Sequence, residues 1–190
     1  PFGLIREVSL NRILVHRHLQ DVFGEAQGPG QLIATLRFGI AVPGILTATS
    51  PQIVGSVAPW RAVLALLLVL DIAAGCVANF TRGTSDFYAV RPRNRWVFIA
   101  IHLHVAVVAV LLNLDLTAAI AVWGYTIAGA VFVNLLAGKP SQTFTGGLLL
   151  AIGLTGIALW PGLSPFMHAV CALFMLKVLF SFAVDHYRHG

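Results

Sequence analysis

The sequence predicts an all-α membrane protein, a six-transmembrane-helix bundle with cytoplasmic N and C termini and an amphipathic helix at the N-terminus. Of the 190 residues, 58% are hydrophobic and only 10% are charged, whereas soluble domains are roughly 25% charged. The apolar residues are gathered in long runs, and the basic residues lie between these runs in alternate connections. This combination is typical of a multi-pass membrane protein.

Residues 1–28 form the longest polar stretch and precede the first apolar run. Apolar residues such as Leu4 and Val8 alternate with basic residues such as Arg6 and Arg12. The pattern predicts a short basic amphipathic helix on the cytoplasmic leaflet. A solvated helix leading into the first span is the alternative. Residues 29–190 are then the transmembrane domain.

Each apolar run supplies close to the ~20 residues that a helix needs to cross ~30 Å of hydrocarbon. We place the spans at about 31–50, 59–80, 95–113, 116–137, 144–161 and 164–185. The first run is the weakest, because Arg37 and Pro43 interrupt it. A broken or kinked helix is expected there, since proline removes a backbone hydrogen bond.

The basic residues predict the orientation of the bundle. Only Arg61 falls on one side of the predicted spans, and nine basic residues fall on the other: Arg6, Arg12, Arg17, Arg82, Arg91, Arg93, Arg95, Lys139 and Arg188. By the positive-inside rule both termini are cytoplasmic, which agrees with an even number of spans. We expect an integral protein of a bacterial-type inner (plasma) membrane.

Four ionisable residues lie inside the apolar runs, where a charge is costly and calls for a function. They are Arg37, Asp71, His102 and Lys177. A rise of ~1.5 Å per residue puts all four about 9–13 Å from the predicted cytoplasmic face. His104 lies about 200° around a continuous helix from His102, so we expect only His102 to face a shared cavity.

Polar stripes with a spacing of four residues extend this layer toward the cytoplasm: Lys177, Ser181 and Asp185 on the last span, and Asp71, Gly75 and Asn79 on the second. The adjoining 79–95 loop contains Arg82, hydroxyl side chains and a glycine that could hold a phosphate or a lipid headgroup. A basic loop that only fixes the topology is the alternative. The predicted substrate-binding residues are Arg37, Asp71, Asn79, Arg82, His102, Lys177, Ser181 and Asp185.

The charges within the spans favour an anionic ligand, because Arg37 and Lys177 face one carboxylate, Asp71. Our first hypothesis is a small-molecule transporter or its substrate-binding membrane subunit, with an anion-favouring site in the cytoplasmic half of the bilayer. The alternative is an intramembrane enzyme acting on a lipid or isoprenoid, with Asp71 and His102 as its acid and base. A further alternative is a structural subunit of a larger complex. In that case the charges meet partner helices. A separate alternative for the polar layer is that Asp71 pairs with Lys177 or Arg37 only to neutralise charges that fix the bundle.

Other classes of site lack support in the sequence. No HExxH, CxxC or dense His/Asp pattern occurs, so we predict no metal site. No nucleotide-binding motif occurs, so energy from ATP would need a partner chain. No GxSxG motif occurs, so the sequence does not indicate a serine nucleophile of that kind. The sequence names no cofactor. The expected partners are membrane lipids, other membrane subunits or further copies of the chain, and a small-molecule or lipid ligand, but no nucleic acid.

Overall fold

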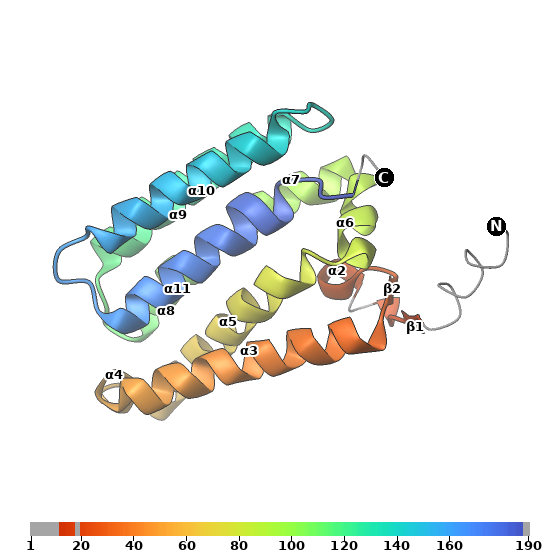
Figure 1. Ribbon diagram of the computed structural model, residues 1–190. Coiled ribbons are helices and arrows are strands. Elements are labelled where there is room, and N and C mark those ends of the chain that lie inside the picture. The colour runs from red at the N-terminus through yellow and green to blue at the C-terminus, as the bar shows by residue number, and fades with distance from the viewer. Residues whose placement is uncertain (1–11, 18–19, 188–190) are drawn as a thin grey trace, which may run out of the picture.

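The computed structural model describes residues 12–17 and 20–187, which are mostly helical. Figure 1 shows the long helices running alongside one another, with most of the short elements gathered at one end. The helices are α2 (Gln20–Phe23), α3 (Pro29–Thr49), α4 (Pro51–Gly55), α5 (Pro59–Ala78), α6 (Arg82–Ala89), α7 (Pro92–Ile101), α8 (His104–Leu111), α9 (Leu116–Leu135), α10 (Gln142–Ala158), α11 (Pro165–Met175) and the π-helical segment η2 (Leu176–Phe182). The helical fold that the sequence predicts is confirmed.

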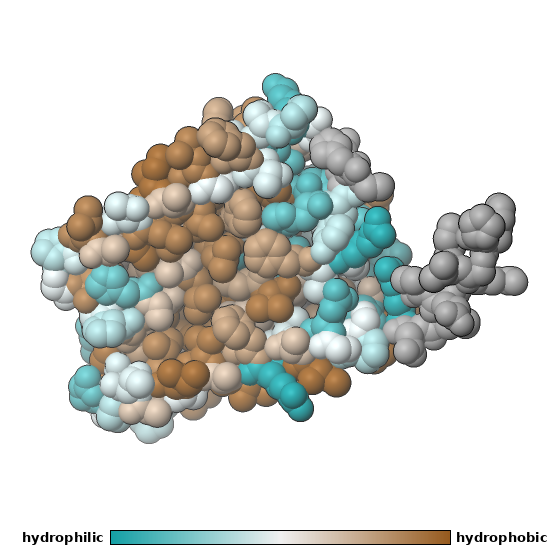
Figure 2. All heavy atoms as spheres, viewed as in Figure 1, coloured by the Kyte–Doolittle hydropathy of each residue, from teal (hydrophilic) through white to brown (hydrophobic). Residues whose placement is uncertain are grey.

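Within the described residues, five helical segments are long and apolar enough to cross a membrane: Pro29–Thr49, Pro59–Ala78, Pro92–Leu111, Leu116–Leu135 and Pro165–Phe182. The sixth apolar helix, α10, has 17 residues. Figure 2 shows apolar side chains over the middle of one face and hydrophilic ones concentrated at the end that carries α6. These features are compatible with a helical bundle in a membrane. The number of spans and the orientation stay predictions.

The segment before α3 differs from the amphipathic helix that we expected. Strand β1 (Ile13–Leu14) pairs antiparallel with β2 (Ala26–Gln27), and the single turn α2 lies between them. Gly24 has φ +69°, and a Cβ at this position would collide with the Gly83 backbone. The turn at Gly24 ends α2 and brings β2 against α6. The rest of the predicted helix, residues 1–11 and 18–19, lies outside the described residues.

Pro43 lies within α3 and does not break it, so of the broken or kinked helix that the sequence predicts, the break is not seen. Thr35, Gly39, Pro43 and Leu46 form the buried stripe of this helix, and α5 is the neighbour against which α3 packs most extensively. Most of the stability of a helix in a protein comes from such packing, which here outweighs one missing backbone hydrogen bond.

The last span occupies the centre of the bundle. Its segments α11 and η2 are the most buried of the five spans, and α3 is the least buried. Ser164 caps the start of α11 by accepting a hydrogen bond from the Met167 backbone N–H. The central position of the last span explains how Lys177, within η2, has only 2% of its surface exposed.

The contact between α3 and α5 can be tested at Gly39. A Cβ at Gly39 would lie 2.9 Å from the Ala74 Cβ, whereas nothing lies within 4 Å of a Cβ at Gly44 on the same helix. Overpacking of this kind costs about 1–3 kcal/mol. We expect Gly39→Leu to lower the thermal unfolding midpoint in detergent and Gly44→Leu to leave it nearly unchanged. Equal midpoints for the two variants would contradict the predicted packing.

Candidate functional site

The third span is broken where its two histidines lie. Helix α7 ends at Ile101, the next residue His102 has φ −79° and ψ 81°, and α8 begins at His104. The His102 Nδ1–H donates to the Phe98 carbonyl oxygen, because a carbonyl can only accept. In a continuous helix this carbonyl would accept from the backbone N–H four residues later. The ring of His102 therefore satisfies a backbone group near the break.

The break brings His102 and His104 into the same pocket, contrary to the prediction of one histidine. Their ring centroids are 4.8 Å apart, and both residues line the pocket. The prediction of 200° between their directions assumed a continuous helix. No proline or glycine lies near the break in the sequence, so the usual signals of an interrupted helix are absent there.

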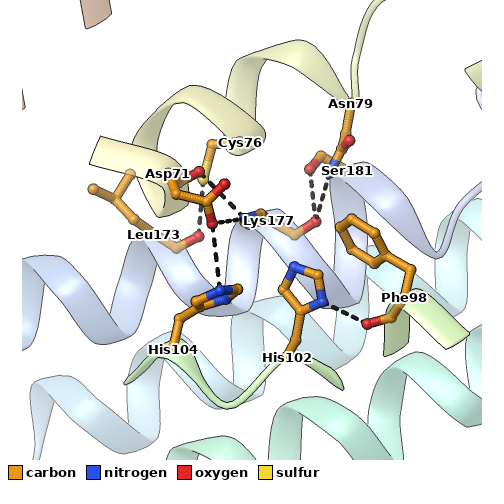
Figure 3. A network of polar contacts seen from close by, with 9 residues as sticks. All are labelled: Asp71, Cys76, Asn79, Phe98, His102, His104, Leu173, Lys177 and Ser181. Atoms are coloured by element: carbon orange, nitrogen blue, oxygen red, sulfur yellow. Dashed lines mark hydrogen bonds and ion pairs between the residues drawn. The ribbon is translucent and has the colours of Figure 1, made fainter. Parts of the chain in front are cut away.

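An ion pair joins the second span to the last one. Lys177 Nζ lies 2.6 Å from Asp71 Oδ2 and 3.2 Å from the Asp71 backbone oxygen. The Lys177 side chain is 3% exposed, whereas the Asp71 side chain is 41% exposed. His104 Nε2 lies 3.7 Å from the same carboxylate oxygen. Figure 3 shows Asp71 placed between Lys177 and His104. The carboxylate is thus the accessible member of a mostly buried pair.

A glycine makes room for Lys177, and two polar side chains hold its segment in place. A Cβ at Gly75 would lie 3.0 Å from Lys177 Nζ and closer still to its Cε, so only glycine leaves this space free. Ser181 Oγ donates to the Lys177 carbonyl oxygen at 2.9 Å, and Asn79 Nδ2 donates to it at 3.4 Å. These two contacts, drawn in Figure 3, anchor the π-helical turn that carries the lysine. Single π-helical turns are frequent at functional sites.

The pocket has a volume of about 410 Å³, which is within the usual range for small-molecule sites. Its walls are formed by Asp71, Gly75, Asn79, Tyr88, Asn94, Val97, Phe98, Ile101, His102, His104 and Lys177. The polar side chains of Asp71 and Lys177 face apolar groups on α7. Val97 and Ile101 in this wall are 52% and 62% exposed, so the rim of the pocket reaches the apolar outer surface.

The structure brings together several of the residues predicted to form one site. Asp71, Asn79, His102 and Lys177 line the pocket, and Ser181 contacts the backbone of Lys177. On α5 the spacing of four residues correctly predicted a shared face for Asp71 and Asn79, because this helix is regular as far as Ala78.

Arg37 does not belong to the pocket, contrary to the prediction. It is exposed on α3, between the buried positions Thr35 and Gly39 that face α5. Helical geometry turns a side chain at this position away from the packed face. The second positive charge that we expected near Asp71 is therefore absent from the pocket wall.

Arg82 and Asp185 also lie outside the pocket wall. Arg82 is exposed and lies 3.8 Å from Asp86 on the same helix. Asp185 is buried and lies 4.0 Å from Arg95, whose Nη2 also donates to the Phe182 and Ala183 carbonyl oxygens. The stripe from Lys177 to Asp185 is not continuous, because η2 ends at Phe182. Asp185 thus pairs with the base of α7.

His186 follows this pair, beyond the last span. Its ring lies 4.9 Å from the Phe80 ring and 5.4 Å from the Phe180 ring, measured between centroids. Burial between these rings lowers the pKa of His186, and the hydrogen bond to the Phe180 carbonyl only partly opposes that effect. The chain end after η2 is therefore packed with a histidine that favours its neutral form.

Sequence reasoning missed six residues of the pocket wall: Tyr88, Asn94, Val97, Phe98, Ile101 and His104. The Phe98 ring lies between His102 and Phe182, with centroid distances of 3.8 and 3.6 Å. A second histidine two positions from the first was a visible signal, but only the break in the helix makes it relevant.

Comparisons with known proteins do not extend this description. No protein-family model matches the chain, and neither the curated proteins nor the solved structures that were searched contain a match. The function must therefore be inferred from the pocket itself.

The space at Gly75 can be tested through Lys177. Lys139 and Lys177 are the two lysines of the chain, so Lys139→Arg leaves one lysine to follow. In that background we expect Gly75→Ala to displace Lys177 from Asp71 and to increase its acylation rate at least several-fold, measured by mass spectrometry. Gly156→Ala, with nothing within 4 Å of its Cβ, is the control. Unchanged acylation in Gly75→Ala would contradict this role.

Proposed function

We propose that the protein is a small-molecule transporter, or the substrate-binding membrane subunit of one, that takes a ligand with an anionic group. Lys177 binds the anion, and Asp71 is the counter-ion that the anion replaces. The polar site lies in the half of the bilayer that the sequence assigns to the cytoplasm, in a bacterial-type inner membrane. Lipids and further membrane subunits are the expected partners.

The observation that carries this proposal is the unequal burial of the ion pair. Lys177 is 3% exposed and holds its charge next to an Asp71 side chain that is 41% exposed at the pocket wall. A buried charge without a partner costs several kcal/mol, so Lys177 needs either Asp71 or an incoming anion. An anion can take the place of Asp71 when that carboxylate accepts a proton. Exchange of this kind couples binding to a proton.

The exposed position of Arg37 changes the expected preference of the site for anions. With Arg37 outside the pocket, Lys177 and Asp71 balance each other and no surplus positive charge remains. The site then favours an anion only after Asp71 is neutralised. This supports binding that depends on pH over constant attraction of anions.

Phenyl phosphate is a suitable probe, because its phosphate matches Lys177 and its ring matches the apolar wall of Phe98, Val97 and Ile101. We expect the detergent-purified chain to bind phenyl phosphate, and to bind phenol at least about 10-fold more weakly, as follows from losing one charge-assisted contact of about 1.5–3 kcal/mol. Isothermal titration calorimetry measures both. Lys177→Met should abolish the preference. Arg37→Gln, an exposed cation on α3, should keep it.

Proton coupling gives a second test. Binding of phenyl phosphate should take up about one proton per chain in the wild type, measured by calorimetry in buffers of different ionisation enthalpy. Asp71→Asn should bind without this uptake and should lose the pH dependence of phenyl phosphate uptake into proteoliposomes. Proton uptake that persists in a folded Asp71→Asn variant would contradict the proposed exchange of Asp71 for an anion.

A second candidate is supported by the exposed apolar rim at Val97 and Ile101. This rim would let a lipid or isoprenoid enter from the side, with Asp71 and His102 acting as acid and base on its head group. An enzyme of this kind would convert the lipid in detergent without a membrane gradient. A transporter would leave it unchanged.

A further inference from the structure

We infer that Asp71, His102 and His104 form a binding site for a divalent transition-metal ion such as Zn²⁺. Each residue offers one ligand atom, and these atoms lie within 4.8 Å of one another. Among the described residues this is the group of three potential ligands that satisfies such a distance. The inference goes beyond the proposed function, because it requires the pocket but no transport.

The ligand types fit such an ion, and one printed separation is close to what it requires, whereas separations of up to 4.8 Å must shorten when the ion binds. Two imidazoles and one carboxylate suit Zn²⁺ or Fe²⁺. Two ligands about 2.1 Å from a tetrahedral zinc ion lie about 3.4 Å apart. His104 Nε2 and Asp71 Oδ2 are 3.7 Å apart, which is too long for a hydrogen bond and close to the separation of two ligands on one ion.

His102 is oriented as a metal ligand usually is. Its Nδ1–H donates to the Phe98 carbonyl oxygen, so Nε2 of the neutral ring carries the free lone pair. Metal-binding histidines almost always donate their other N–H to a carbonyl or carboxylate, which fixes the ring and its tautomer. Stacking on Phe98 at 3.8 Å between centroids further restricts the ring.

His104 also turns one ring nitrogen toward Asp71. Its Nδ1 is buried and has no hydrogen-bond partner among the described residues, while its Nε2 faces Asp71. Figure 3 shows both imidazoles on the same side of Asp71, on the segment where the third span is broken. A polar atom buried without a partner costs about 1–3 kcal/mol. Binding of a cation through Nε2 leaves Nδ1 without an acceptor, so the bonds to the ion must exceed this cost.

Lys177 is compatible with the ion but weakens its binding. A carboxylate that binds a metal commonly accepts a hydrogen bond as well, and Lys177 Nζ already lies 2.6 Å from Asp71 Oδ2. The lysine also lies 3.2 Å from the Asp71 backbone oxygen, which remains available when the carboxylate turns toward the metal. The positive charge of Lys177 repels the ion, so its removal should strengthen metal binding.

The remaining coordination position faces the pocket. Three protein ligands leave one position of a tetrahedral ion for water or an anion, and the adjacent volume of about 410 Å³ can hold one. The site is therefore of the open kind.

Metal titration of the full chain in detergent tests this inference. We expect one Zn²⁺ per chain, with Co²⁺ giving the visible spectrum of a tetrahedral site. Asp71→Asn, His102→Gln and His104→Gln should each weaken Zn²⁺ binding by at least about 100-fold, which exceeds the usual effect of losing an outer contact. His168→Gln, at the start of α11, should bind like the wild type. Lys177→Met should bind Zn²⁺ more tightly.

The outcomes separate the two proposals. Failure to saturate at one Zn²⁺ per chain, or wild-type binding by a folded His104→Gln variant, overturns the metal site, whatever phenyl phosphate does. If Zn²⁺ binds as expected but phenyl phosphate binding does not depend on Lys177, the metal site stands and the transporter fails. The opposite effects of Lys177→Met on the two ligands give one variant that tests both.

Discussion

The ion pair between Asp71 and Lys177 is the constraint on which the rest of the site depends. A lysine in the most buried span has little access to water, with 2% of its surface exposed, so the bundle must supply a counter-charge, space and hydrogen bonds around it. Asp71 supplies the charge, Gly75 supplies the space, and the segment around Lys177 is held by Asn79 and Ser181. All four features lie on two helices that are distant in the sequence. The pocket lies between this ion pair and the break in the third span.

The sequence alone predicted the parts of the structure that depend on regular periodicity. The apolar runs gave the long helices, because helices satisfy their own backbone groups in an apolar medium. The spacing of four placed Asp71 and Asn79 on one face, and depth brought Asp71, His102 and Lys177 to the same level. These inferences hold because they need only the rise and twist of a standard helix.

The predictions were wrong where a helix is irregular, or where the direction of a side chain matters more than its depth in the predicted membrane. Depth placed Arg37 with the other charges, but its position between Thr35 and Gly39 on α3 turns it outward. The break at His102 rests on a contact between a side chain and a backbone carbonyl, which no local propensity encodes. The end of η2 at Phe182 likewise takes Asp185 off the expected stripe. The break involves a contact only four residues apart in the sequence, but, like the packing of α3, it departs from the regular periodicity on which the predictions depended.

The exposed guanidinium on α3 has a consequence for where the protein can reside. Arg37 stands eight residues inside the start of α3 at Pro29, about 12 Å along the axis. In a bilayer, its long stem would carry the charge up to the headgroups. This fixes the height of α3 relative to the nearer leaflet, whereas an uncharged helix would slide or tilt to relieve hydrophobic mismatch. A thicker membrane would then strain the bundle at α3, its least buried span.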